Sequence, residues 1–257
     1  MLLKMKNGLN KSWFWVGLAL LVFSILPYFV KIIPDSLYEV YLGLINLLFS
    51  SLIVCALHFN GITEKLKSLK ALNYSFIILA VSGFLMILEG IGFNVLGLDD
   101  TLLLVAYFLF IVTLYLLFED VYIRKTPLKI AASVILTLLV VLLFSGNIEL
   151  VLASKVGFIT KLLAIIPPII DVILLAGLIS ILIMVHTNLF FKTYGLMLAA
   201  VFFMFLSDFL NIPINASGAI IPFNFADIFT IIAYFCAFLF ILRQSFNLKN
   251  LKPTKKV

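Results

Sequence analysis

Eight long apolar runs limit what this chain can fold into. A helix that crosses a bilayer needs about 20 mainly apolar residues. The windows that qualify are residues 12–33, 38–59, 72–96, 101–119, 128–146, 161–185, 192–212 and 221–242. Only "GFNVLGLDD" separates the third window from the fourth, but a merged helix would be far too long for one crossing. With 64% hydrophobic and 12% charged residues, the sequence predicts an all-α, polytopic membrane helix bundle with eight transmembrane helices.

The basic residues are distributed unevenly between the two sides of this predicted bundle. Lys and Arg near span ends are retained in the cytoplasm more readily than they are translocated. If both termini are cytoplasmic, only Lys31, Lys155 and Lys161 of the 18 basic residues fall outside. The sequence therefore predicts a multi-pass protein of the cell membrane with cytoplasmic N- and C-termini and a basic tail at residues 244–257. The lipid bilayer accounts for the net charge of +6, and no nucleic-acid partner is expected.

The acidic residues show the opposite distribution. Four of the twelve fall within the outer halves of predicted spans: Glu89, Asp171, Asp208 and Asp227. A charged side chain costs about 2.5–3.5 kcal/mol at the centre of a span, and less near the interface. Asp171 is the deepest of the four, because it follows Lys161 by ten residues, or roughly 15 Å of helix. The polar chemistry of this chain is therefore expected on the outer side, around Asp171.

Two prolines precede Asp171 in the sixth predicted span. Pro167 and Pro168 cannot donate backbone hydrogen bonds, so the carbonyls of Leu163 and Ala164 lose their usual helical partners. Polar groups that lipid cannot satisfy need a packed neighbour, water or a ligand. Two interpretations stay open: a structural kink in which Asp171 bonds a neighbouring helix, and a polar cavity that Asp171 lines.

The two halves of the chain contain similar segments. "DTLLLVAYF" at Asp100–Phe108 aligns without gaps on "DIFTIIAYF" at Asp227–Phe235, and the offset is 127 residues. A parallel duplication of a four-helix unit, with halves at residues 12–125 and 126–243, would explain this match, and so would convergence on an apolar composition. In both copies a Tyr follows the Asp by seven residues, so the two side chains lie on one helical face.

The second half has an outline that is similar to a known class of membrane region. Pro168 precedes Asp171 at the start of one span, Asp208 lies near the end of the next, and Asp227 is followed by Tyr234. Over about 80 residues, this outline resembles the polytopic membrane sensor regions that precede histidine kinase, PAS or diguanylate cyclase modules in bacteria and archaea. The resemblance implies a signal-input bundle whose last span passes a displacement to an output module. Only about 15 residues follow that span, so we expect a separate cytoplasmic or membrane signalling partner, or a truncated chain.

The sequence thus predicts a sensor or receptor-like bundle with an outward-facing acidic pocket and no output domain of its own. The residues predicted to bind a small ligand or a cation are Asp171, Asp208, Asp227, Glu89, Tyr234 and Pro168. A small permease or a proton or cation channel is the alternative, because outer-half carboxylates also suit an ion pathway. An accessory subunit of a membrane complex is the third interpretation, and it would show no enclosed pocket.

Enzymatic and metal-binding motifs are few, so the sequence favours a protein that is not an enzyme and indicates no particular cofactor. The two histidines, His58 and His186, lie near span ends, where a structural role is more common than haem ligation. Cys55 and Cys236 lack the C-x-x-C spacing of a zinc site and do not form a disulfide framework. No zinc-protease or phosphate-loop motif occurs.

Overall fold

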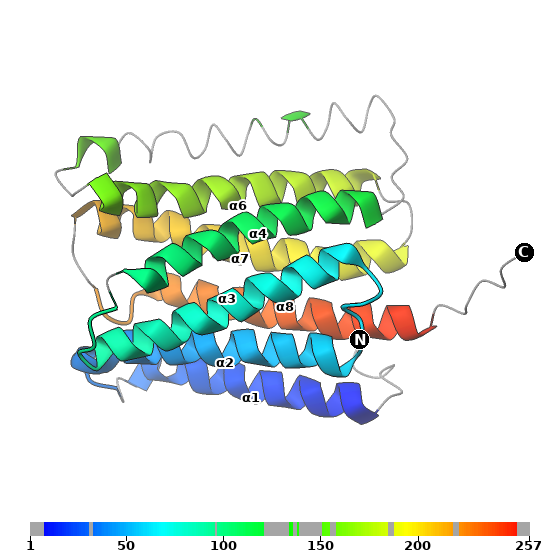
Figure 1. Cartoon of the computed structure of the whole chain (residues 1–257), viewed down its shortest axis with the longest axis horizontal. Helices are drawn as coiled ribbons and strands as arrows, with labels where there is room; N and C mark the ends of the chain where they lie inside the picture. The colour runs from blue at the N-terminus through cyan, green and yellow to red at the C-terminus, as the bar shows by residue number, and fades with distance from the viewer. Residues whose placement is uncertain are drawn as a thin grey trace, which may run out of the picture.

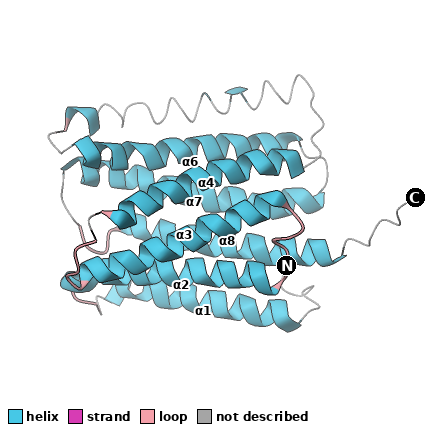
Figure 2. Cartoon of the chain, in the orientation of Figure 1, coloured by secondary structure: helices cyan, strands magenta, loops and turns pink. Residues whose placement is uncertain are grey.

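A computed structural model describes residues 8–30, 33–95, 97–120, 134–135, 138, 151–154, 158–184, 188–217 and 221–250 of the chain. This part of the protein is helical and contains no strand (Figure 2). A short 3-10 helix, η2 (Asp35–Leu37), precedes the second helix. The long helices are α1 (Gly8–Val30), α2 (Tyr38–Phe59), α3 (Lys67–Gly90), α4 (Leu98–Asp120), α6 (Phe158–Met184), α7 (Asn188–Ser217) and α8 (Phe225–Asn250).

Each of these seven helices contains a stretch that is long and apolar enough to span a membrane. The prediction of an all-α bundle with several membrane-spanning helices is confirmed for the described residues. The division at "GFNVLGLDD" is also correct, because α3 ends at Gly90 and α4 begins at Leu98. The fifth predicted span, at residues 128–146, lies outside the described residues apart from 134, 135 and 138. The count of eight spans therefore stays a prediction.

Six of the helices form a closed ring. Along the chain α2 contacts α3, α3 contacts α4, α4 contacts α6, α6 contacts α7 and α7 contacts α8, and α8 then returns to contact α2. Helix α1 lies outside the ring, against α8 and α2 (Figure 1). We call the end of the bundle at which α1 begins and α8 ends the proximal end, and the opposite end the distal end.

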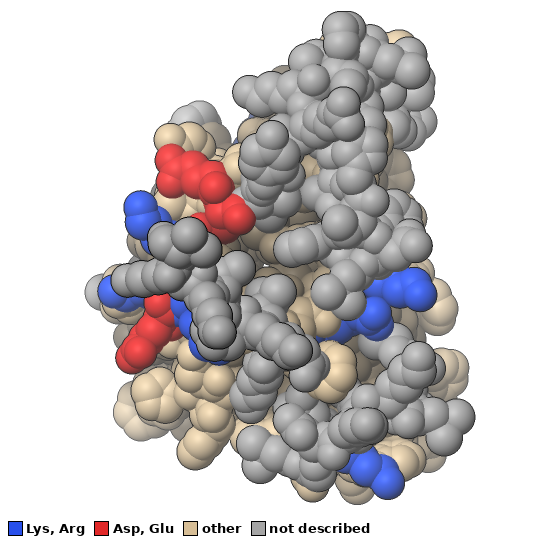
Figure 3. Space-filling model, turned by 90° about the vertical axis from the view of Figure 1, so that its right-hand side faces the viewer, with Lys and Arg blue, Asp and Glu red and all other residues tan. Residues whose placement is uncertain are grey.

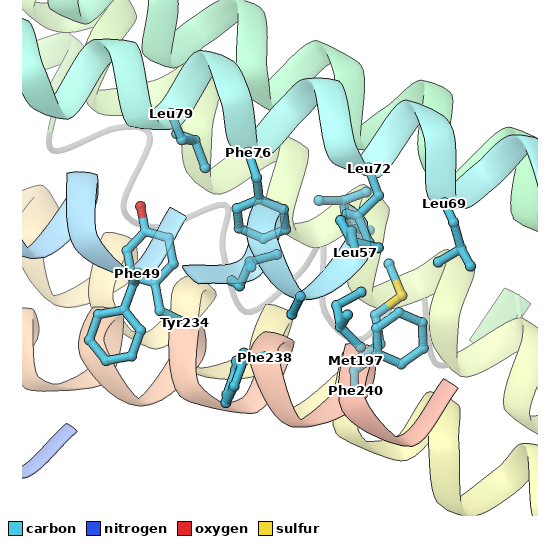
Figure 4. Close-up of a cluster of buried hydrophobic side chains, with 14 of the residues drawn as sticks. Phe49, Leu57, Leu69, Leu72, Phe76, Leu79, Met197, Tyr234, Phe238 and Phe240 are labelled. Carbon is cyan, nitrogen blue, oxygen red and sulfur yellow. The ribbon is translucent and has the colours of Figure 1, made fainter. Parts of the chain in front are cut away.

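The two surfaces of the ring differ in what they expose. Many large apolar side chains are exposed on the outside, such as Phe23 and Phe29 of α1 and Phe108 and Tyr115 of α4. Patches of this extent are expected where lipid surrounds a protein and are rare on soluble ones. The buried core lies in the interior and includes side chains from all six ring helices, and Figure 4 shows members from α2, α3, α7 and α8.

Two glycines allow α2 and α3 to pack backbone against backbone. A Cβ atom on Gly83 would lie 2.7 Å from the backbone nitrogen of Leu47, and one on Gly43 would lie 2.7 Å from the carbonyl oxygen of Gly83. Small residues at such crossings are typical of membrane helix pairs, which depend on close van der Waals contact. This crossing holds α2, one wall of the ring, tightly against α3.

We therefore expect Gly83→Ala to destabilise the protein, although alanine favours helix formation more than glycine does. The added methyl group would push two backbones apart, at a cost of about 1–3 kcal/mol. The thermal unfolding midpoint of the purified protein in detergent measures this effect. Gly195→Ala in α7 is the matched control, because a Cβ there meets no atom within 4 Å. Equal midpoints for the two variants would contradict the close crossing of α2 and α3.

Candidate functional site

A cavity of about 250 Å³ lies inside the six-helix ring. Every helix of the ring contributes to its wall, and α1 does not. Most of the wall is apolar, with Leu72, Leu114, Leu178, Met197 and Phe240 among the residues nearer the proximal end. The polar lining residues are Asn46, Tyr107, Asp171, Asp208, Asp227, Thr230 and Tyr234. The cavity is thus an apolar space with a localised group of polar side chains.

Two carboxyl groups from neighbouring helices meet in this wall. Asp171 of α6 is 1% exposed, and its carboxyl group lies within hydrogen-bonding reach of that of Asp208 in α7. The hydroxyl of Tyr107 in α4 donates a hydrogen bond to Oδ2 of Asp208 over 2.9 Å. The Oδ2 atom of Asp171 is buried and receives no hydrogen bond from any described residue.

This carboxyl pair has a defined chemical capacity. Two ionised carboxylates offer only acceptors, so a hydrogen bond between them requires that one of them carries a proton. A pair that shares a proton can accept one from a bound molecule and donate one to it, which is the arrangement used in general acid–base chemistry. The buried Oδ2 of Asp171 is also a group that should be paired, because an unsatisfied buried polar atom is costly.

A second polar group faces the cavity from α2 and α8. The hydroxyl of Tyr234 donates a hydrogen bond to Oδ1 of Asn46, and Ser50 donates to the same oxygen over 3.3 Å. The Tyr234 ring stacks on that of Phe49, with centroids 5.8 Å apart and planes 12° apart (Figure 4). These contacts fix the amide of Asn46 at the cavity wall, and the Nδ2 of an amide is a hydrogen-bond donor. The cavity therefore offers an amide donor as well as carboxyl groups.

Asp227 lies in the first turn of α8, at the distal end of the cavity. Tyr38 of α2 donates a hydrogen bond to its Oδ2 over 2.5 Å. The turn itself is capped by Asn224, whose side-chain oxygen accepts a hydrogen bond from the backbone amide of Ala226 over 3.1 Å. Such a cap satisfies one of the free amides at a helix start. Asp227 is thus buried and held at the junction of α2 and α8.

Four of the six predicted site residues line this one cavity: Asp171, Asp208, Asp227 and Tyr234. Glu89 does not; it is exposed at the distal end of α3, close to Asp99. Pro168 is buried in α6, which continues as one α-helix through both prolines, but it does not line the cavity either. Whether any of the six binds a ligand stays a prediction.

The sequence interpretation missed two polar residues of the site. Asn46 was not considered, although it is a lone amide in the apolar segment "LGLINLLF", and an isolated polar residue in a span is itself a functional signal. Thr230 lies one turn after Asp227, and its hydroxyl pairs with that of Ser207 over 2.7 Å. Tyr107, noticed only as part of the repeated segment, is the hydrogen-bond partner of Asp208.

The described residues contain no cluster of three or more His, Cys, Asp or Glu side chains that could hold a metal ion. His58 is exposed near the proximal end of α2, and His186 lies outside the described residues. Comparison with protein-family models, curated proteins and solved structures found no match. The resemblance to membrane sensor regions thus rests on the outline of the second half alone.

We expect Tyr107→Phe to destabilise the protein, because it leaves Asp208 without its hydroxyl donor at a buried position. The loss should be about 1–2 kcal/mol, as for a hydrogen bond to a carboxyl group inside a membrane protein. Thermal unfolding in detergent is the measurement. Tyr74→Phe is the control, because Tyr74 is 50% exposed on the outside of α3. If Tyr107→Phe and Tyr74→Phe have the same thermal unfolding midpoint, the hydrogen bond from Tyr107 to Asp208 does not stabilise the protein.

Proposed function

We propose that this protein is a receptor-like membrane bundle that binds a small ligand inside the six-helix ring. The observation that carries the proposal is that Asp171 lines the cavity while its buried Oδ2 atom lacks a hydrogen-bond donor among the described residues. A ligand that donates a hydrogen bond, as an amine or a hydroxyl does, would satisfy this atom.

The shape of the cavity supports an amphiphilic ligand. Its wall runs along α8 from Asp227 to Phe240, which corresponds to roughly 20 Å of helix. The polar residues lie in the distal and middle parts of this length, and the proximal part is lined by Leu114, Leu178 and Met197. An apolar body with one small polar group fits this distribution, because each part would meet a wall of its own kind.

The charges at the two ends support the predicted orientation. Figure 3 shows the proximal end, where the described basic residues outnumber the acidic residues Glu64, Glu119 and Asp120; the basic residues are Lys11, Lys65, Lys67, Lys70, Lys192 and Arg243. Described acidic residues of the distal end include Asp35, Glu39, Glu89, Asp99 and Asp100. Under the preference of Lys and Arg for the cytoplasm, the proximal end with both termini is cytoplasmic and the distal end faces outside.

This orientation suggests how binding would be transmitted. Asp227 and Tyr234 line the cavity from α8, and the same helix continues to Asn250 at the proximal end. A ligand that shifts α8 would displace its cytoplasmic end, where a signalling partner could detect the change. Packed helices transmit such shifts because they move as rigid elements.

A second function, acid–base catalysis, is favoured by the pairing of Asp171 with Asp208. In a hydrolysis, one carboxylate would take a proton from water while the other carboxyl group donates one to the leaving oxygen. A lipid extract incubated with the purified protein would then yield products by mass spectrometry that Asp208→Asn does not yield. A permease is less well supported, because the proximal wall of the cavity is apolar.

The binding proposal is tested by native mass spectrometry of the purified protein. We expect the wild type to retain a small molecule that Asp171→Asn loses, because the amide cannot reproduce the carboxyl group. Asp35→Asn is the matched control and should retain the molecule, since Asp35 is exposed in η2 and does not line the cavity. Equal retention in all three proteins, or no bound molecule in any of them, would contradict the proposal.

A further inference from the structure

Four aromatic side chains cluster where α1 ends, α2 begins and the chain approaches the start of α8, at the distal end of the bundle. Tyr28 comes from α1, Tyr38 and Tyr41 come from α2, and Phe223 comes from the loop between α7 and α8. The ring of Phe223 contacts all three tyrosines, with centroid distances of 5.5, 5.3 and 5.8 Å respectively. Phe223 thus fills a cage that the three tyrosines form, and we call these four residues the aromatic cluster.

The aromatic cluster lies directly against the polar lining of the cavity. Tyr38 contacts Phe223 and also donates the hydrogen bond to Asp227, which lines the cavity. The hydroxyl of Tyr28 is buried beside the carboxyl group of Asp227, although it makes no well-directed hydrogen bond. Only one layer of side chains therefore separates the ring of Phe223 from the cavity wall.

Tyr41 secures the cage to α1, because its hydroxyl donates a hydrogen bond to the backbone carbonyl of Ser24. The cage is consequently built on two helices that hydrogen-bond to each other. Phe223 belongs to neither of these helices, so its ring can leave the cage without separating α1 from α2.

The backbone of Phe223 is in a conformation that phenylalanine rarely adopts. Its φ of 54° is left-handed, and it is the one non-glycine residue with a positive φ in the described part of the chain. A bulky side chain is strained in this region, and such strain persists only where the surroundings enforce it. The next residue is held on two sides, since Asn224 donates to Asn211 over 2.6 Å and caps α8. The strain is therefore confined to the residue that fills the cage.

We propose that Phe223 is a plug that closes the distal entrance of the cavity, and that its departure from the tyrosine cage opens a path past Asp227 to the carboxyl pair. When the ring leaves the cage, release of the strained backbone would partly offset the loss of aromatic contacts. This inference concerns how the cavity is reached and holds for any ligand or substrate. It is therefore separate from the proposal that Asp171 binds one.

Cysteine labelling tests the plug without knowledge of the natural ligand. Cys55→Ala and Cys236→Ala first remove the two native thiols. Thr230→Cys then places one thiol in the cavity wall, one turn beyond Asp227. In lipid nanodiscs, the probe is the small cationic thiol reagent 2-(trimethylammonium)ethyl methanethiosulfonate, which does not cross lipid. We expect Phe223→Ala to raise its labelling rate at position 230 by about tenfold or more.

Phe223→Asn is the second variant, because asparagine tolerates the left-handed backbone but lacks the aromatic ring. It should raise the labelling rate as Phe223→Ala does, while Phe223→Tyr should leave it low. Lys67→Cys in the same background, at an exposed position of the proximal end, should label equally with each residue at position 223. Thermal unfolding identifies the variants that fold.

Three outcomes would overturn the proposal. Equal labelling at position 230 with and without the Phe223 ring would mean that the cavity is reached by another route, such as laterally from the lipid. An increase with Phe223→Ala but not with Phe223→Asn would mean that the ring is not the barrier. Failure of both variants to label would mean that the path past Asp227 does not exist. Loss of the bound molecule in Asp171→Asn bears only on binding and leaves the plug unaffected.

Discussion

Lipid provides no hydrogen-bond partners, and most of this structure follows from that constraint. Each polar side chain within a span must find its partner inside the protein. The six-helix ring meets this need by enclosing Asp171, Asp208, Asp227 and Asn46, while the outer surface exposes mainly apolar side chains. The contacts of Tyr107 with Asp208 and of Tyr38 with Asp227 also join helices that are distant in the sequence. The same polar groups thus stabilise the ring and give the cavity its chemistry.

The extent of the helices could be predicted from the sequence, because a span needs a minimum apolar length. The side of each helix that faces inward could not. Glu89 and Asp208 occupy similar places near the ends of their spans, yet Glu89 is exposed and Asp208 faces the cavity. In a helix that is apolar all round, periodicity does not mark the buried face. Which face is buried depends on the neighbouring helices, and these pairings are absent from a single sequence.

The hydrogen-bond partners of the polar residues also could not be predicted from the sequence. Asp227 and Tyr234 were expected on one helical face and both line the cavity, but the hydroxyl of Tyr234 bonds to Asn46, 188 positions away. The two predicted halves nevertheless make equivalent contacts with each other. In the predicted duplication α2 corresponds to α6 and α4 corresponds to α8, and the structure shows that α2 contacts α8 and that α6 contacts α4. In the cavity wall, Asn46 of α2 lies beside Tyr234 of the second half. Asp171 of α6 likewise lies near Tyr107 of the first half. A duplication would explain these equivalent contacts, and it stays a prediction.

The closed ring has a consequence for kinetics. Because each ring helix contacts both neighbours, the described helices restrict the sideways exit of a molecule from the cavity. If Phe223 is the plug that we propose, escape through the distal end requires rearrangement of packed aromatic side chains. Dissociation would therefore be slow even for a weakly bound molecule, and the time that a ligand stays bound would be governed by protein motion. The occupancy of such a protein would average ligand exposure over long periods and would not follow rapid fluctuations in concentration.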